Sequence, residues 1–195
     1  MAIPATITIN AGDIARKGFN QFFEPIVDRC RDVSPAWDVV RQTFFGIEER
    51  LFEQEGQTSE HSKWAPLSES YNAWKQRVSP GDKILQLGGE TSRDYELIKE
   101  LTGKGPYVEY QSKRSWYYGT EAKAKEGGYL ATIHTTGLPH RIHPMPAREP
   151  IRLTEDDRQA IAQPLIYYVL TGRIAWRLRE SRDKYGWLRA NPEFA

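Results

Sequence analysis

The stretch SPAWDVVRQTFFGIEERLFEQEG, residues 34–56, decides the fold because it carries the clearest helical pattern in the chain. Its apolar side chains recur every three or four residues, which places them on one face of an α-helix. These side chains are Trp37, Val40, Phe44, Ile47 and Leu51. Ser34 and Pro35 are typical of a helix start, and Gly56 is typical of a helix end. The stretch therefore predicts a long helix whose aromatic face packs into the core.

The same stretch contains acidic residues on both sides of Arg50, which we expect to form a solvated helix face. These residues are Glu48, Glu49, Glu53 and Glu55.

Helical spacing also predicts a first helix from Asp13 to about Arg31. We expect Pro25 to kink that helix or end it early, because proline lacks a backbone donor. Cys30 lies on the apolar face of this helix, so we interpret it as a small core residue rather than a nucleophile. Because it is the chain's one cysteine, an internal disulfide is excluded.

Three further helices are predicted toward the C-terminus. Ser68 is placed to cap a short helix, and residues 91–101 have the spacing of another. The last main helix is expected to start at Thr154, since Asp157 completes a capping pattern three residues later.

Runs rich in β-branched and aromatic residues predict strands at residues 5–9, 106–110, 115–120 and 129–136. Short polar turns between strands favour antiparallel pairing. The fold class predicted is α+β, a small antiparallel β-sheet packed by long helices, with a C-terminal helical arm. We assign residues 1–170 to the α+β domain and residues 171–195 to a basic and aromatic arm.

Composition narrows the class of protein. The chain has 195 residues, 27 Lys and Arg against 26 Asp and Glu, and a formal net charge of +1. A near-neutral chain creates no global field that would draw it to nucleic acid or anionic lipid. Neither a membrane-spanning apolar run nor a signal peptide is recognisable, so we expect an intracellular, soluble protein.

Three of the four histidines lie close together, at His134, His140 and His143. Three histidines and a water can hold a catalytic zinc ion, so a zinc-dependent cell-wall peptidase is one hypothesis. Their spacing differs from the HExxH helix pattern, and no carboxylate lies between Glu126 and Glu149 to act as a local base. We therefore predict loop residues, no metal, no cofactor and no catalytic residue.

Seven short motifs follow one another in a single order along the chain. They are LFEQEG (51–56), WAPLSESYNAWK (64–75), PGDKILQLGG (80–89), YGT (118–120), YLATIHTTG (129–137), MPARE (145–149) and LTEDDRQAI (153–161). This order resembles the phage virion morphogenesis family, also described as Mu-like tail-completion or neck proteins. The resemblance covers roughly residues 35–170.

The resemblance implies a structural, non-enzymatic role that completes the tail or joins head to tail. The implied partners are further copies in a homo-oligomeric ring, expected to be a hexamer, and other neck or tail proteins. Those other proteins are a tail terminator, a tail tube or a head–tail connector. Genome DNA would pass through the lumen of the ring, and no membrane is involved. The implied location is the virion neck or tail, with assembly in the host cytoplasm.

Partner-binding residues are expected in the MPARE loop and in the arm, since Arg and Trp dominate many interfaces. They are Arg148, Glu149, Arg173, Trp176, Arg177 and Trp187. A third hypothesis is a nucleic-acid-binding module that acts through the arginines of the arm. Those arginines are Arg173, Arg177, Arg179 and Arg182. The near-neutral net charge argues against this third hypothesis.

Overall fold

The structure, a computed structural model, describes residues 18–86, 96–124, 127–138 and 145–174. The chain divides into two compact units. The described part of the first unit consists of residues 18–43, 111–115 and 160–174. The second unit holds the other described residues, between positions 44 and 110 and between 116 and 159. The strand predicted at residues 5–9 lies outside the described residues.

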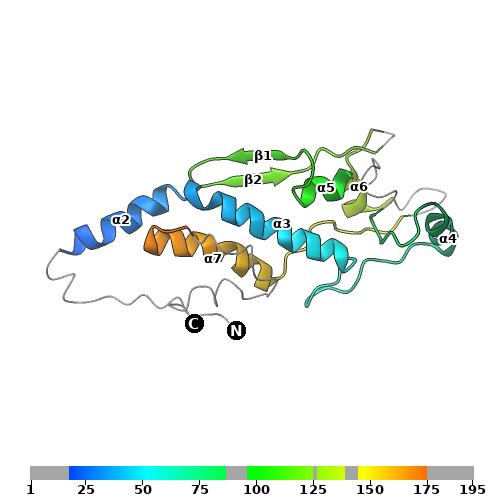
Figure 1. Cartoon of the computed structure of the whole chain (residues 1–195), viewed down its shortest axis with the longest axis horizontal. Helices are drawn as coiled ribbons and strands as arrows, with labels where there is room; N and C mark the ends of the chain where they lie inside the picture. Colours follow the sequence, from blue (N-terminus) through cyan, green and yellow to red (C-terminus); the bar gives the residue numbers. More distant parts are fainter. Residues whose placement is uncertain (1–17, 87–95, 125–126, 139–144, 175–195) are drawn as a thin grey trace. The chain divides into compact units, whose positions relative to one another are not determined.

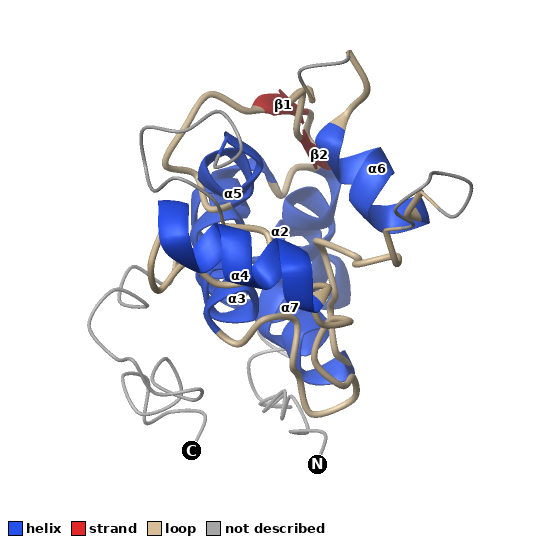
Figure 2. Cartoon of the chain, turned by 90° about the vertical axis from the view of Figure 1, so that its right-hand side faces the viewer, coloured by secondary structure: helices blue, strands red, loops and turns tan. Residues whose placement is uncertain are grey.

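The described residues form six α-helices, one 3-10 helix and a two-stranded antiparallel sheet, which confirms the α+β prediction (Figure 1). In chain order the elements are α2 (Phe19–Arg31), η1 (Ser34–Ala36), α3 (Trp37–Glu53), α4 (Glu69–Val78), α5 (Glu96–Leu101), β1 (Val108–Gln111), β2 (Trp116–Gly119), α6 (Leu130–Thr136) and α7 (Glu155–Thr171). Figure 2 shows that helices make up much more of the described structure than strands do. None of these helices has the length and apolar character that a membrane span needs.

The long helix predicted from residues 34–56 is present as η1 followed by α3. Gly56 ends it as predicted: its φ is 81°, and its N–H donates to the carbonyl oxygen of Leu51. The prediction for Ser34 is wrong in detail. Instead of accepting a capping bond, Ser34 donates its N–H and its hydroxyl to the carboxylate of Asp32.

In the first unit, α2 continues past Pro25 to Arg31, so the proline does not end the helix. Near its C-terminus, Arg29 donates from Nε to the carbonyl oxygen of Val169 at 2.6 Å and from Nη2 to that of Leu170 at 3.1 Å. The guanidinium thus satisfies the last carbonyl groups of α7. Because the last turn of α2 directs Arg29 toward α7, the adjacent Cys30 is exposed, and its predicted burial is wrong.

Residues 130–136 form helix α6 and not the predicted strand. Four β-branched residues favoured a strand, but the hydroxyl groups of Thr135 and Thr136 donate to carbonyl oxygens four residues earlier, which a helix allows. Leu130 and Ala131 pack against the buried core of the second unit. Gly137, with φ of 69°, then ends the helix. Tertiary packing therefore overrides strand propensity here.

The core of the second unit joins segments that lie far apart in the sequence. Its buried apolar residues are Leu51, Phe52, Trp64, Leu97, Ile98, Leu101 and Ala122. Beside it, the inner face of the β1–β2 hairpin places Trp116 and Tyr118 against Phe44 of α3, with ring centroids 5.8 and 5.3 Å away. Such tilted aromatic contacts stabilise a core beyond their buried area.

Candidate functional site

Four of the seven segments that carry the family resemblance meet in the second unit, where side chains of one motif bond the backbone of another. We call this assembly the motif junction and define it by Gly56, Trp64, Arg148, Glu149, Arg152, Thr154 and Asp157. Each of the four segments LFEQEG, WAPLS, MPARE and LTEDD contributes at least one of these residues.

Trp64 is the centre of the motif junction. Its side chain is 2 % exposed, and its Nε1–H donates to the carbonyl oxygen of Glu149 at 2.8 Å. The ring packs edge-on against Phe52, with centroids 5.5 Å apart. A Cβ built on Gly56 would lie 2.5 Å from the indole, so only glycine leaves room for this ring. The indole therefore links LFEQEG to MPARE.

Arg148 also has an internal role. It is 3 % exposed, and it donates from Nε to the carbonyl oxygen of Ala65 at 2.9 Å and from Nη2 to that of Pro66 at 3.1 Å. Its own N–H donates to the carbonyl oxygen of His134 at 2.6 Å. Burial lowers the pKa of the guanidinium from its ordinary value. Arg148 thus connects the MPARE loop to both WAPLS and α6.

A second arginine strengthens the same connection. Arg152 donates from Nη1 to the carbonyl oxygen of Ser62 at 3.0 Å and to that of Gly56 at 3.4 Å. Its Nε lies 3.6 Å from the carboxylate of Glu149. Most of the arginine bonds of the motif junction therefore end on backbone carbonyl groups, an arrangement that fixes loops.

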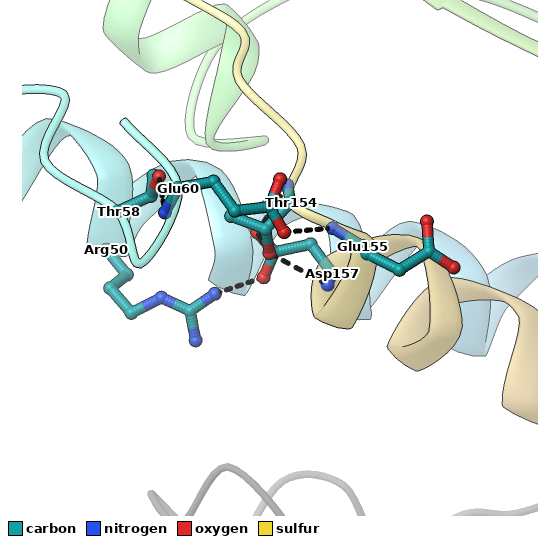
Figure 3. Close-up of polar contacts among 6 residues, drawn as sticks. All are labelled: Arg50, Thr58, Glu60, Thr154, Glu155 and Asp157. Carbon is teal, nitrogen blue, oxygen red and sulfur yellow. Dashed lines mark hydrogen bonds and ion pairs between the residues drawn. The ribbon is translucent and has the colours of Figure 1, made fainter. Parts of the chain in front are cut away.

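The N-terminus of α7 is capped from three directions (Figure 3). Thr154 donates its N–H to Oδ2 of Asp157, and the Asp157 N–H donates back to the Thr154 hydroxyl at 3.1 Å. Arg50 of α3 donates to Oδ1 of Asp157 at 2.6 Å. Glu60 accepts from the N–H of Glu155 at 2.8 Å. The predicted capping pattern is confirmed, and two loops and a helix converge on it.

Glu48 contradicts the prediction of a solvated acidic face. Its side chain is fully buried, and neither carboxylate oxygen has a hydrogen-bond partner among the described residues. Burial, and secondarily the negative charge of Asp157, raise the pKa of Glu48 well above its ordinary value. The sequence contained the signal, because Glu48 lies four residues after Phe44 and four before Phe52 on the apolar face.

Of the three histidines in the zinc hypothesis, His134 is half-buried in helix α6, so its prediction as a loop residue is wrong. His140 and His143 lie outside the described residues. Among the described residues, no group of three or more His, Cys, Asp or Glu side chains could hold a metal ion. The zinc hypothesis depends on His140 and His143, so it stays a prediction.

The predicted partner-binding residues fall into three groups. Arg148 is buried in the motif junction, while the side chain of its neighbour Glu149 is 57 % exposed. Arg173 is exposed just after α7. The remaining ones, Trp176, Arg177 and Trp187, lie outside the described residues, as do Arg179 and Arg182 of the nucleic-acid hypothesis. The boundary at residue 171 stays a prediction.

Sequence reasoning missed two exposed apolar surfaces in the second unit. The first is the outer face of the hairpin, where Val108, Tyr110 and Tyr117 are 45, 62 and 63 % exposed. The second is a stripe on α4, where Tyr71, Trp74 and Val78 are 43, 41 and 54 % exposed. Strand alternation and helical spacing in the sequence place the residues of each surface on one face of its element. They do not show which face of that element is buried.

Comparison with known proteins gives no match: no family model, curated protein or solved structure is similar to this chain at a significant level.

Proposed function

We propose that this chain is a non-enzymatic structural protein of a tailed phage virion. In this proposal it forms a homo-oligomeric ring at the neck or the tail end, where it completes the tail or joins it to the head. The single observation that carries the proposal is the motif junction. Segments recognised only by their order in the sequence are bound to one another in space.

The hydrogen bonds between the motifs support treating these motifs as one structural unit and not as independent short matches. Trp64 of WAPLS bonds Glu149 of MPARE, and Arg148 of MPARE bonds Ala65 and Pro66 of WAPLS. Arg152 bonds the carbonyl oxygen of Gly56 in LFEQEG. If the motifs were chance matches, nothing would require them to contact one another.

The chemistry of the motif junction supports a scaffold role. Its arginines and its tryptophan donate chiefly to backbone carbonyl groups, and Asp157 is occupied by Thr154 and Arg50. These groups hold loops in place, while clusters of exposed apolar side chains lie on the hairpin and on α4. Exposed aromatic surfaces are typical of proteins that assemble with partners.

The test is to interrupt the coding sequence in the phage or prophage genome that contains it. After induction, we expect electron micrographs of the lysate to show filled heads and separate or unfinished tails, with no infectious particles. Wild-type protein supplied from a plasmid should restore infectivity. A lysate that contains intact, infectious particles without the protein would refute the proposal.

The zinc peptidase predicts a different result in the same experiment. Particles would assemble normally, and the defect would appear in entry into or release from the host cell. Intact particles together with such a defect would replace the structural proposal with the enzymatic one.

A further inference from the structure

We propose that the outer hairpin face of one copy docks on the α4 stripe of the next copy, so that the chain associates head to tail. This inference rests on the proposed function, since it names the surfaces through which the ring would form. The hairpin face consists of Val108, Tyr110 and Tyr117, and the α4 stripe consists of Tyr71, Trp74 and Val78.

The hairpin face is a sheet surface whose side chains are exposed in the part of the chain that the structure describes. Tyr110 and Tyr117 lie opposite each other across the two strands, with ring centroids 6.0 Å apart. Beside them, a Cβ built on Gly119 would meet no atom within 4 Å, so the surface next to the two rings is open. Within the described residues, no third strand joins β1 and β2. The hairpin therefore presents two tyrosine rings that an apolar partner could cover.

The α4 stripe has matching chemistry. Its residues are spaced three and four apart along the helix, and the rings of Tyr71 and Trp74 have centroids 5.3 Å apart. Lys75, next to them on the helix, is turned inward, where its Nζ donates to the carbonyl oxygen of Lys83. With that ammonium group buried, the stripe is uncharged, as is the hairpin face.

Uncharged aromatic surfaces select an uncharged aromatic partner, and this chain supplies one. Nucleic acid would need a cationic surface, which neither patch provides. One border of each patch carries a charge opposite to that of the other: Arg77 is beside the stripe, and Glu121 is just beyond β2, while the turn at the other end of the hairpin carries Lys113 and Arg114. Arg77 and Glu121 are both exposed, and neither has an ion-pair partner among the described residues. This complementarity favours a second copy as the occupant.

Contact between two different patches has a geometric consequence. A contact of one patch with itself would close a dimer, whereas a contact between different patches leaves one unused patch at each end of the assembly. Further copies can add at both ends, and the assembly closes into a ring where the rotation between neighbouring copies permits it.

The experiment uses the full chain in a Cys30→Ser background, which avoids disulfide cross-linking through the exposed thiol. Variant A carries Tyr110→Lys and Tyr117→Lys, and variant B carries Trp74→Lys. Variant C, Tyr129→Lys, is the matched control, because Tyr129 is 49 % exposed but lies outside both patches. Circular dichroism melts verify that each variant is folded, and Tyr110→Ser with Tyr117→Ser replaces variant A if lysine prevents folding.

Sedimentation velocity from about 10 to 500 µM measures association. We expect wild type and variant C to oligomerise, and the association constants of A and B to fall at least about tenfold, as for aromatic residues at interface centres. An equimolar mixture of A and B should form a 1:1 dimer and nothing larger, because only one intact contact remains. Arg77→Glu should weaken wild-type association, and Glu121→Arg added to it should restore it.

Three outcomes would overturn the inference. The wild-type chain could be monomeric over the whole concentration range, variant A or B could associate as strongly as wild type, or the mixture of A and B could form no dimer. The proposed function is tested separately by the interrupted gene. A chain that is monomeric in solution but whose loss separates heads from tails would refute only the docking contact.

Discussion

At the residue scale, two features of the second unit depend on packing: the space that Gly56 leaves for Trp64, and the buried carboxyl group of Glu48. Neither follows from residue type alone. Glycine has several uses in loops, and glutamate is usually solvated. Each residue acquires its role from the side chains that the fold places around it.

Gly56 and Gly81 form a matched pair that separates backbone strain from lack of space. Both have positive φ, 81° and 85°, but a Cβ at Gly56 would overlap the Trp64 ring, whereas at Gly81 it would meet nothing within 4 Å. Gly81→Ala should lower the free energy of unfolding by about 1–2 kcal/mol, the cost of left-handed backbone. Gly56→Ala should cost clearly more. Denaturant titration measures both, and equal losses would mean that Trp64 moves aside freely.

Glu48 predicts a dependence of stability on pH. Its pKa is raised in the folded protein above the ordinary 4.5, so between these values the folded state binds more protons than the unfolded state. The wild-type protein therefore has its full free energy of unfolding below the ordinary pKa of Glu48. It loses part of that free energy as pH rises through the raised pKa. Glu48→Gln should therefore match wild type at pH 4 and be more stable at pH 8, by roughly 1–3 kcal/mol.

The control for Glu48 is Glu49→Gln, because Glu49 is half-exposed and pairs with Lys104 on the surface. Its effect should stay within about 0.5 kcal/mol across the same pH range. If Glu48→Gln followed the wild-type curve at every pH, Glu48 would be solvated in solution.

At the element scale, sequence patterns predicted the structure wherever local chemistry and packing agree. Residues 34–56 contain a helical apolar face and a terminal glycine, and α3 follows both, although Ser34 does not cap it. Residues 130–136 contain β-branched residues that favour a strand, yet α6 forms because Leu130 packs onto a core assembled from distant segments. The motif junction could not be predicted in detail, because its bonds join side chains to backbone carbonyl groups more than 80 residues away.

The capping of α7 gives an element-scale prediction. The Thr154 hydroxyl accepts from the Asp157 N–H and donates to its carboxylate, so Thr154→Ala should lower the free energy of unfolding by about 0.5–2 kcal/mol. Thr154→Ser keeps the hydroxyl and should retain most of that stability. Thermal melts compare the two variants. Equal losses in both would show that the methyl group of Thr154, not its hydroxyl, matters.

At the scale of the whole molecule, the two compact units have different contents. The first joins α2 to the end of α7 through Arg29, and the second contains the motif junction and both exposed aromatic surfaces. A scaffold that fixes loops internally and exposes aromatic side chains suits a protein whose work is assembly. The proposed function therefore requires contacts between copies of this chain and contacts of the chain with other virion proteins.

The most direct test of the central claim is the amount of this protein in purified virions. Particles from the encoding phage, banded on a density gradient, would be analysed by quantitative mass spectrometry with labelled peptides from this chain and from the major capsid protein. The account predicts that the protein remains with infectious particles at a fixed, low copy number per particle that is consistent with one ring. Its absence from gradient-purified infectious particles, with all of it left in the soluble lysate, would contradict the account.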